Sequence, residues 1–399
     1  MNKYYERAYA LEEQLVKDRR TLHQNPEIGM ELPNTRAYVR NRLEEIGLEV
    51  KEVGKMGLSA VIEGEKPGKT ILLRADMDAL PMKEMNELEY KATNNMAHTC
   101  GHDLHTAMLV TAAQILLENK ADIHGRVKLM FQPGEEIFAG AKDMIEAGIL
   151  ENPKPDVAFA MHTGLNQGVG SFEYYKGHTS TSCDNFKITI TGKGAHGAYP
   201  HTSIDPINAG VIIYQEFGEL ISREVSPLSV ATLTFGMFSG GSNSNIIPEV
   251  VEMQGTLRTY DDEVREYIKG RITDILAGIE KTTRAKIDFE IFASVPSLYN
   301  DPDLTEEIAE ILETGNPAFK GYPDLRIMAS EDMAVVSRHL PTTYIMLNCK
   351  VEGNNFSHHN PGVLFDEAAL PIGAGSFATV AIEWLKKHSD TNSMSVTEG

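Results

Sequence analysis

The order of helical and strand patterns along the 399-residue chain is the feature that most constrains its fold. Over residues 1–182, segments with helical periodicity, such as 4–22 and 106–117, alternate with short apolar runs typical of strands, at 70–74, 126–131 and 156–161, and the same alternation returns after residue 295. Alternating strands and helices are typical of a mostly parallel sheet with helices on both faces. We therefore expect residues 1–182 and 295–399 to form one discontinuous α/β domain.

A different order separates those two parts. Between residues 183 and 294 the patterns read strand, helix, strand, strand, helix, strand, which is the order of a ferredoxin-like α+β domain. We expect residues 183–294 to be a compact domain inserted into the first one. The expected elements are strands at 186–191, 229–238, 250–259 and 286–292, and helices at 205–221 and 262–282.

Charge and cysteine content exclude several classes of function. The 37 Lys and Arg residues against 57 Asp and Glu residues give a net charge of -20, which disfavours binding to nucleic acid or to anionic membranes. No apolar run approaches the ~20 residues of a membrane-spanning helix, and the first residues lack the apolar region of a signal peptide. Three cysteines cannot form a disulfide framework. We expect a cytoplasmic protein.

Histidines and acidic residues gather in five short segments, at residues 74–81, 100–105, 131–136, 161–162 and 358–361. The first four lie just beyond a predicted strand or between a strand and a helix. Ligands of open α/β sheets bind at the carboxyl ends of the strands, so we expect these segments to converge on one crevice.

The side chains of these segments offer thiolate, imidazole and carboxylate donors, which suit zinc or manganese rather than calcium. Five donors exceed the needs of one tetrahedral ion, and two neighbouring ions would activate a water molecule. Glu135 could move that water's proton if Gln132-Pro133-Gly134 forms a turn. The five candidate ligands are Cys100, His102, Glu136, His162 and His359.

Each candidate also has a structural interpretation. A single His such as His162 is more often a hydrogen-bonded structural residue, Cys100 a packed thiol, and the pair Glu135-Glu136 a solvated turn. Taken together, the segments leave the metal centre and the structural alternative equally open.

A series of ordered motifs resembles one known family. The chain is similar along nearly its whole length to the aminoacylase and hippurate hydrolase family of metallohydrolases, which includes plant auxin-conjugate hydrolases and bacterial N-acyl-amino-acid amidohydrolases. The motifs are at residues 23–29, 73–82, 99–107, 131–136, 192–201, 330–333 and 359–361.

The resemblance implies a catalytic α/β domain with two divalent ions and a smaller lid and dimerisation domain. It implies Mn²⁺ or Zn²⁺, with Ni²⁺ or Co²⁺ as further candidates, held by the five ligands named above. Glu135 would be the general acid and base. His196 would be the lid histidine that polarises the scissile carbonyl, from the same subunit or from a partner. The reaction would release a carboxylic acid and a free amino acid from an N-acyl-amino acid.

The chain departs from the wider clan at one metal-binding position. Asp76-Met-Asp78 stands where that clan has His-x-Asp, so that Cys100 with His102 replaces the missing histidine, as in this branch. Asp78 would then orient a ligand, and the role of Asp76 stays open. Because Asn360-Pro361 follows His359, we favour His359 over His358 as the ligand.

Two residues of the inserted domain are candidates for substrate recognition. Arg258 or Asn245, both expected on its inner strands, would bind the α-carboxylate of the substrate. The structural alternative for Arg258 is an ion pair with a surface acid. The edge strands of this domain also make a homodimer a reasonable expectation.

Other functions remain to be compared with amide hydrolysis of N-acyl-amino acids. The same centre would serve a dipeptidase, a carboxypeptidase or an N-acetyldiaminopimelate deacetylase. A cysteine hydrolase would use Cys100 as nucleophile with His102 or His105 as base. A metal-binding protein without activity would lack the base, yet Glu135 is present.

Overall fold

The computed structural model describes residues 1–389, and the chain divides into two compact units. The first unit contains Met1–Gly177, Tyr299–Arg326 and the chain from Val335 onward. The second contains His178–Leu298 and the short segment Ile327–Ala334, which the sequence analysis placed in the first domain. Each unit is described separately.

An eight-stranded sheet forms the centre of the first unit, in the order β1-β2-β4-β3-β5-β16-β6-β15. Its four middle strands are parallel to one another, while β1, β2 and β6 add antiparallel pairs. The strands are β1 (Val50–Val53), β2 (Gly57–Glu63), β3 (Lys66–Asp76), β4 (His124–Gln132), β5 (Val157–Gly164), β6 (Ser171–Glu173), β15 (Lys320–Tyr322) and β16 (Thr342–Asn348). The predicted mostly parallel sheet is confirmed.

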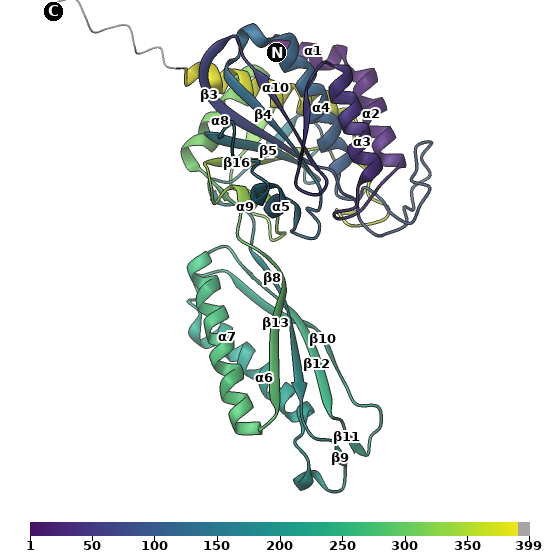
Figure 1. Ribbon diagram of the computed structural model, residues 1–399, viewed down its shortest axis with the longest axis vertical. Coiled ribbons are helices and arrows are strands. Elements are labelled where there is room, and N and C mark those ends of the chain that lie inside the picture. Colours follow the sequence, from purple (N-terminus) through teal and green to yellow (C-terminus); the bar gives the residue numbers. More distant parts are fainter. Residues whose placement is uncertain (390–399) are drawn as a thin grey trace, which may run out of the picture. The chain divides into compact units, whose positions relative to one another are not determined.

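Two apolar helices are buried against this sheet. In α4 (His102–Glu118) and α10 (Ala369–Lys387) nearly every residue is buried, and the two helices contact each other and α1 (Figure 1). The other helices are α1 (Lys3–Ala10), α2 (Glu12–Gln24), α3 (Pro33–Glu45), η1 (Lys120–Asp122), α5 (Gly140–Glu146), α8 (Pro302–Gly315) and α9 (Met333–Val336). The single helix predicted over residues 4–22 is wrong, because the chain breaks into α1 and α2 at Leu11.

The second unit has the predicted ferredoxin-like order. Its sheet runs β10-β12-β8-β13 with every neighbour antiparallel, and α6 and α7 pack on one face of it (Figure 1). Along β8 the apolar residues Phe186, Ile188 and Ile190 are buried, while Lys187 and Thr189 between them are partly exposed. This alternation is expected of a sheet covered on one side only.

The elements of the second unit are β8 (Cys183–Thr191), η2 (Pro200–Thr202), α6 (Pro206–Glu219), η3 (Leu220–Glu224), β10 (Ala231–Gly240), β12 (Val250–Thr259), α7 (Asp262–Thr283) and β13 (Lys286–Val295). Two small sheets were not predicted. One, in the second unit, joins β9 (Ala195–His196) to β11 (Ile246–Ile247). The other joins β7 (Gly177–His178) to β14 (Tyr299–Asn300), and β14 belongs to the first unit. No helix among residues 1–389 has the length and apolar character needed to cross a membrane.

Candidate metal centre

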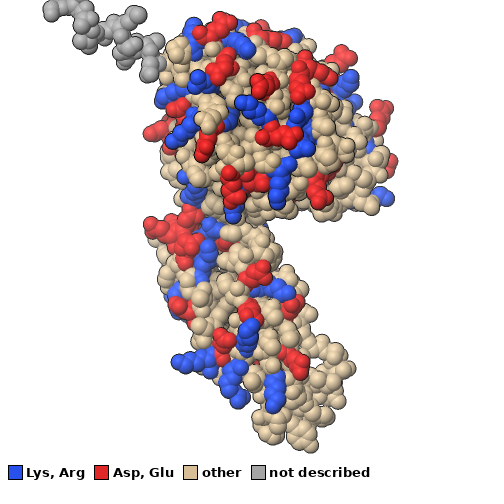
Figure 2. Space-filling model, in the orientation of Figure 1, with Lys and Arg blue, Asp and Glu red and all other residues tan. Residues whose placement is uncertain are grey.

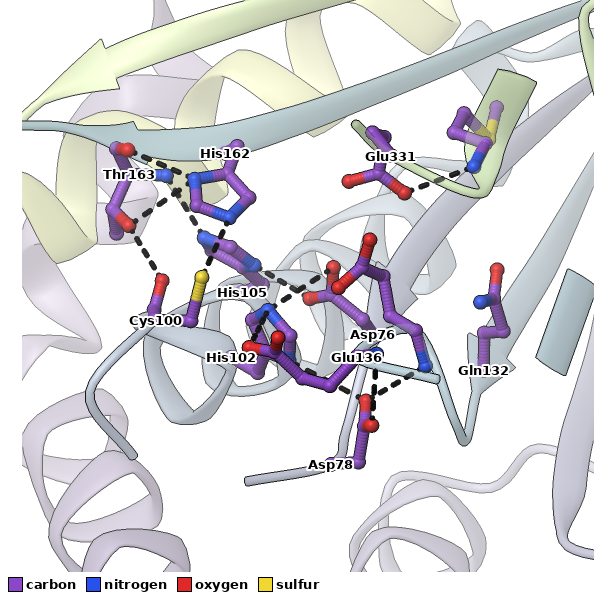
Figure 3. A network of polar contacts seen from close by, with 12 residues as sticks. Asp76, Asp78, Cys100, His102, His105, Gln132, Glu136, His162, Thr163 and Glu331 are labelled. Carbon is purple, nitrogen blue, oxygen red and sulfur yellow. Dashed lines mark hydrogen bonds and ion pairs between the residues drawn. The ribbon is translucent and has the colours of Figure 1, made fainter. Parts of the chain in front are cut away.

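The carboxyl ends of three neighbouring parallel strands carry the polar residues singled out in the sequence. Asp78 follows β3, Glu135 and Glu136 follow β4, and His162 lies near the end of β5. His102, in the first turn of α4, and Cys100, just before that helix, belong to the same cluster. Figure 3 shows Cys100, His102, Glu136 and His162 directed toward a common region.

Cys100 and two histidines form the first group of donors. The Cys100 Sγ lies 3.3 Å from the Nε2 of His162, and the donor atoms of Cys100, His102 and His162 all lie within 4.8 Å of one another. All three residues are buried. Since His162 Nδ1 faces the carbonyl oxygen of Thr163 at 2.9 Å, Nδ1 carries the proton and Nε2 presents its lone pair to Cys100.

Glu136 and His359 form a second group with the same thiol. The Nε2 of His359 lies 3.3 Å from the Glu136 Oε1, and both residues have donor atoms within 4.8 Å of the Cys100 Sγ. His359 has a positive φ of 60° and its N–H donates to the carbonyl of Thr99, which holds its backbone beside the residue that precedes Cys100. His358 instead contacts the Thr163 Oγ1 at 3.3 Å.

Asp78 holds the turn that presents the two glutamates. Its Oδ1 accepts the backbone N–H of Glu135 at 3.0 Å, and its Oδ2 accepts that of Glu136 at 3.2 Å. The Oδ1 also lies 3.5 Å from the Nδ1 of His102, so one carboxylate orients a histidine and a turn together. Glu135 is buried, with a carboxylate oxygen within 4.8 Å of the donor atoms of His102 and Glu136.

A buried layer that the sequence did not predict lies at Asp76. The Asp76 Oδ2 accepts a hydrogen bond from Arg74 at 2.7 Å, and its Oδ1 accepts one from the Nδ1 of His105 at 2.6 Å. The Nε2 of His105 in turn accepts the N–H of Thr163 at 2.9 Å. Because Arg74 and His105 already satisfy Asp76, we interpret it as support for the centre rather than as a ligand.

A second buried ion-pair cluster fixes the first turn of α4. Asp103, which follows His102, accepts the Nδ1 of His23 at 2.8 Å and lies 2.9 Å from the Nε of Arg19. The Nε2 of His23 contacts Glu84 at 3.1 Å. The motif around His23 pointed to this segment, but no local pattern indicates that His23 reaches Asp103.

The carboxylates around His102 dominate the electrostatics of the centre. Burial lowers the pKa of His102, but Asp76, Asp78 and Glu136 outweigh that effect and raise it to about 10. Burial, together with Glu136 and Glu135, raises the pKa of the Cys100 thiol well above its usual range. Burial and the nearby His105 and His358 hold the pKa of His162 well below its usual range.

These donors fit a transition metal. The Nε2 of His102 is buried and has no hydrogen-bond partner among the described residues, an arrangement that costs free energy unless a ligand satisfies it. The Oε1 of Glu136 is also buried, and the residue nearest to it in an ion-pair contact is the half-exposed His359, at 3.3 Å. Sulfur and imidazole beside a carboxylate are the donors that Zn²⁺ and similar ions prefer.

The other three predicted site residues belong to the second unit. His196 is exposed in β9, and its neighbour Gly197 donates its N–H to the carbonyl of Asn245 at 2.7 Å, so the two predicted residues lie on one small ribbon. Arg258 lies on β12, where its Nη1 donates to the Ser330 Oγ at 2.9 Å. The partner of the Arg258 guanidinium in this hydrogen bond is therefore a hydroxyl, not the surface acid of the structural alternative.

Comparisons with known proteins place this arrangement in a family. A sequence model described as peptidase family M20/M25/M40 matches residues 72–383, which contain all ten predicted site residues. The chain belongs to this family. The family predicted from the ordered motifs is therefore confirmed.

Two curated relatives and one solved structure illustrate the family. The chain is 34% identical to thermostable carboxypeptidase 1 of Saccharolobus solfataricus, covering 94% of this chain and 97% of the relative. It is 34% identical to the hippurate hydrolase of Campylobacter jejuni, covering 94% and 98%. The YXEP protein of Bacillus subtilis, described as a dinuclear metal binding peptidase from the M20 family, has 30% identity and a TM-score of 0.81, with 95% and 99% of the two chains covered.

Proposed function

We propose that this M20 protein hydrolyses the amide bond of N-acyl-amino acids with two divalent metal ions. The observation that carries the proposal is the buried cluster of sulfur, nitrogen and oxygen donors with the Glu135 carboxylate beside it. The relationship to a hippurate hydrolase supports the acyl-amino-acid substrate, and the dinuclear relative supports two ions. The proposed ligands are Cys100, His102, Glu136, His162 and His359.

The two overlapping donor groups support a pair of ions with a shared thiolate. Cys100 belongs both to the group with His102 and His162 and to the group with Glu136 and His359. We propose Zn²⁺ or Mn²⁺, with Ni²⁺ or Co²⁺ as alternatives. Thiolate and imidazole ligands favour softer ions such as Zn²⁺, and a carboxylate also suits a harder ion such as Mn²⁺. Metal analysis of protein purified without chelator tests the identity and the number of ions per chain.

The residues of the chain have separate roles in the proposed reaction. Bound divalent ions would polarise the acyl carbonyl and lower the pKa of the attacking water. Glu135 accepts a proton from that water and delivers it to the nitrogen of the leaving amino acid, so that the C–N bond breaks as the amine becomes neutral. Asp78 keeps Glu135 in place through the backbone N–H that it accepts.

The second unit supplies the proposed substrate contacts. We propose that His196 polarises the scissile carbonyl and that Arg258 or Asn245 binds the α-carboxylate, since guanidinium and carboxylate form paired hydrogen bonds. Kinetics of Arg258→Ala test this assignment. An unchanged KM for acyl-amino acids would remove Arg258 from recognition.

A carboxypeptidase or dipeptidase is the second candidate, favoured by the relationship to a carboxypeptidase. An N-acetyldiaminopimelate deacetylase would use the same groups. A substrate panel of benzoyl-, acetyl- and aminoacyl-amino acids on metal-reconstituted protein distinguishes these candidates. Turnover of aminoacyl substrates at rates above every N-acyl substrate would overturn the proposed specificity.

The geometry argues against a cysteine hydrolase. Catalysis by Cys100 needs a thiolate, whereas burial and the neighbouring glutamates raise the pKa of that thiol. His105, one of the two bases considered for it, donates through Nδ1 to Asp76 and accepts through Nε2 from Thr163, so neither nitrogen is available. Activity that survives exhaustive EDTA treatment would reverse this conclusion.

We propose a homodimer formed through the second unit. The strand β10 is at the edge of its sheet, and Val230 and Phe238 on and beside it are exposed. Figure 2 shows few charged side chains over the end of this unit that carries β9 and β11. Sedimentation that detects only a 44.1 kDa species at micromolar concentration would exclude the dimer.

The three free, buried cysteines support a reducing, cytoplasmic location.

A further inference from the structure

Thr163, the residue after His162 in β5, bonds to three different parts of the metal centre. Its N–H donates to the Nε2 of His105 at 2.9 Å, and its carbonyl oxygen lies 2.9 Å from the Nδ1 of His162. Its hydroxyl donates to the carbonyl oxygen of Cys100, also at 2.9 Å. The residue is completely buried, and Figure 3 shows it beside both Cys100 and His162.

The direction of each hydrogen bond at Thr163 follows from its partner. A carbonyl oxygen can only accept, so the hydroxyl proton of Thr163 is committed to Cys100. The Oγ1 can then accept from the Nε2 of His358, which lies 3.3 Å away. Because the Thr163 carbonyl binds the proton on His162 Nδ1, the His162 Nε2 that faces the Cys100 Sγ has its lone pair available.

The backbone between Cys100 and His102 is shaped to receive the Thr163 side chain. Gly101 has a φ of 88°, and a Cβ built on it would lie 2.5 Å from the Thr163 Oγ1 and 2.7 Å from its Cγ2. The threonine side chain thus occupies the space that any other residue at position 101 would need. This close approach adds to the hydrogen bond from the Thr163 hydroxyl to Cys100, so that two contacts hold the loop of the thiol against β5 at Thr163.

We propose that the Thr163 hydroxyl is a positioning group that sets the Cys100 thiolate against His162 for metal binding. The proposal rests on the metal centre proposed above. The hydroxyl acts at the carbonyl of Cys100, one residue's backbone away from the Sγ, and Thr163 does not itself touch the metal or the substrate. Partners that orient metal ligands in this way contribute roughly 10–100-fold to metal affinity.

The test compares side chains that differ in the hydroxyl alone. Thr163→Val keeps the shape of threonine without the hydroxyl, and Thr163→Ser and Thr163→Ala form a smaller pair with the same difference. Metal-free full-length protein is titrated with Co²⁺, and the thiolate-to-cobalt charge-transfer absorption reports both the affinity and the Cys100–cobalt bond. The matched control is Thr343→Val, because the buried Thr343 hydroxyl bonds to Thr305 at 3.0 Å and to no residue of the centre.

The expected result is a cobalt affinity weakened about 10–100-fold in Thr163→Val, with a weaker charge-transfer band. Thr163→Ser and Thr343→Val should bind cobalt like the wild type. If Thr163→Val does not fold, Thr163→Ala should still bind more weakly than Thr163→Ser by a similar factor. Equal affinities within both pairs would overturn the role of the hydroxyl. A wild-type protein without any thiolate band would overturn the metal centre itself, and the proposal with it.

Discussion

The close approach of Gly101 and Thr163 gives a quantitative prediction for Gly101→Ala. A φ of 88° places an alanine in the left-handed region, which costs about 1–2 kcal/mol. The new Cβ would also lie 2.5 Å from the Oγ1 and 2.7 Å from the Cγ2 of Thr163, inside van der Waals contact. Overpacking of this kind in a buried place costs about 1–3 kcal/mol. We expect Gly101→Ala to lower the free energy of unfolding by about 2–5 kcal/mol.

The two contributions can be separated with a double-mutant cycle. Thr163→Ala removes both atoms that the new Cβ would meet first and leaves the Thr163 Cβ, at 3.2 Å, as the nearest contact. Most of the steric part of the cost should then disappear, because a contact at 3.2 Å needs a shift of only a few tenths of an ångström, while the backbone part remains. We therefore expect the double variant to be about 1–3 kcal/mol more stable than the sum of the two single changes indicates.

Urea unfolding of metal-free protein measures these free energies without a contribution from bound ions. Trp384 is the only tryptophan of the chain and lies buried in α10, so its fluorescence reports on the first unit. Additive effects within about 0.5 kcal/mol would refute the contact between Gly101 and the Thr163 side chain. A Gly101→Ala protein as stable as the wild type would refute the whole argument.

Three further predictions concern catalysis and pH. Glu135→Gln should keep its metal content but lose about 10²–10⁴-fold in kcat, measured beside metal analysis, and a fully active variant would remove Glu135 as the base. If His196 acts across a dimer, mixing the inactive His196→Ala and Glu135→Gln proteins should restore activity through hybrid dimers; a mixture that stays inactive after subunit exchange would place His196 in its own subunit's site. Burial lowers the pKa of His98 to about 3. Between pH 6.5 and pH 3 the unfolded chain therefore binds one more proton than the folded chain, and the free energy of unfolding decreases as the pH falls through this range. Compared with the wild type, metal-free His98→Phe should therefore lose less stability between pH 7 and pH 5, by about 2 kcal/mol in urea unfolding, and parallel pH profiles would contradict this.

The sequence predicted the parts of the fold that have strong local periodicity. In the second unit, the alternation along β8 and the helical period of α7 predicted both elements, and the order of the unit followed from such patterns. The antiparallel β2 was missed because Gly57, Ser59 and Ala60 interrupt its apolar residues, which leaves neither a clean alternation nor a continuous apolar run. The break at Leu11 was missed because apolar residues continue on one stripe through α1 and α2.

The site could be predicted as a set of residue types but not as a network. His105 lies three residues after His102, the spacing of one helix face, yet nothing local indicates that it donates to Asp76 rather than to a metal. Thr163 gave no signal, because its role depends on a loop more than sixty residues earlier in the chain. Such support comes from tertiary contacts, which periodicity and motif spacing do not encode.

The distribution of buried charge explains where this centre needs a cation. The charge of Asp76 is balanced by Arg74 and by the proton of His105, and Asp78 is stabilised by two backbone N–H groups. Glu136 has weaker partners: its buried Oε1 lies 3.3 Å from the Nε2 of His359 and 3.9 Å from that of His102, and makes no hydrogen bond among the described residues. In metal-free protein the compensation must come from protons, which is why the pKa of His102 is raised to about 10 by the surrounding carboxylates despite its burial. Metal ligands bind only after losing their protons, so a divalent ion would replace the proton of His102 and that of the Cys100 thiol and supply the same positive charge. The charge of Asp76 is thus largely balanced without an ion, whereas the charge of Glu136 depends on the protonation of His102 and His359, whose place a divalent ion would take.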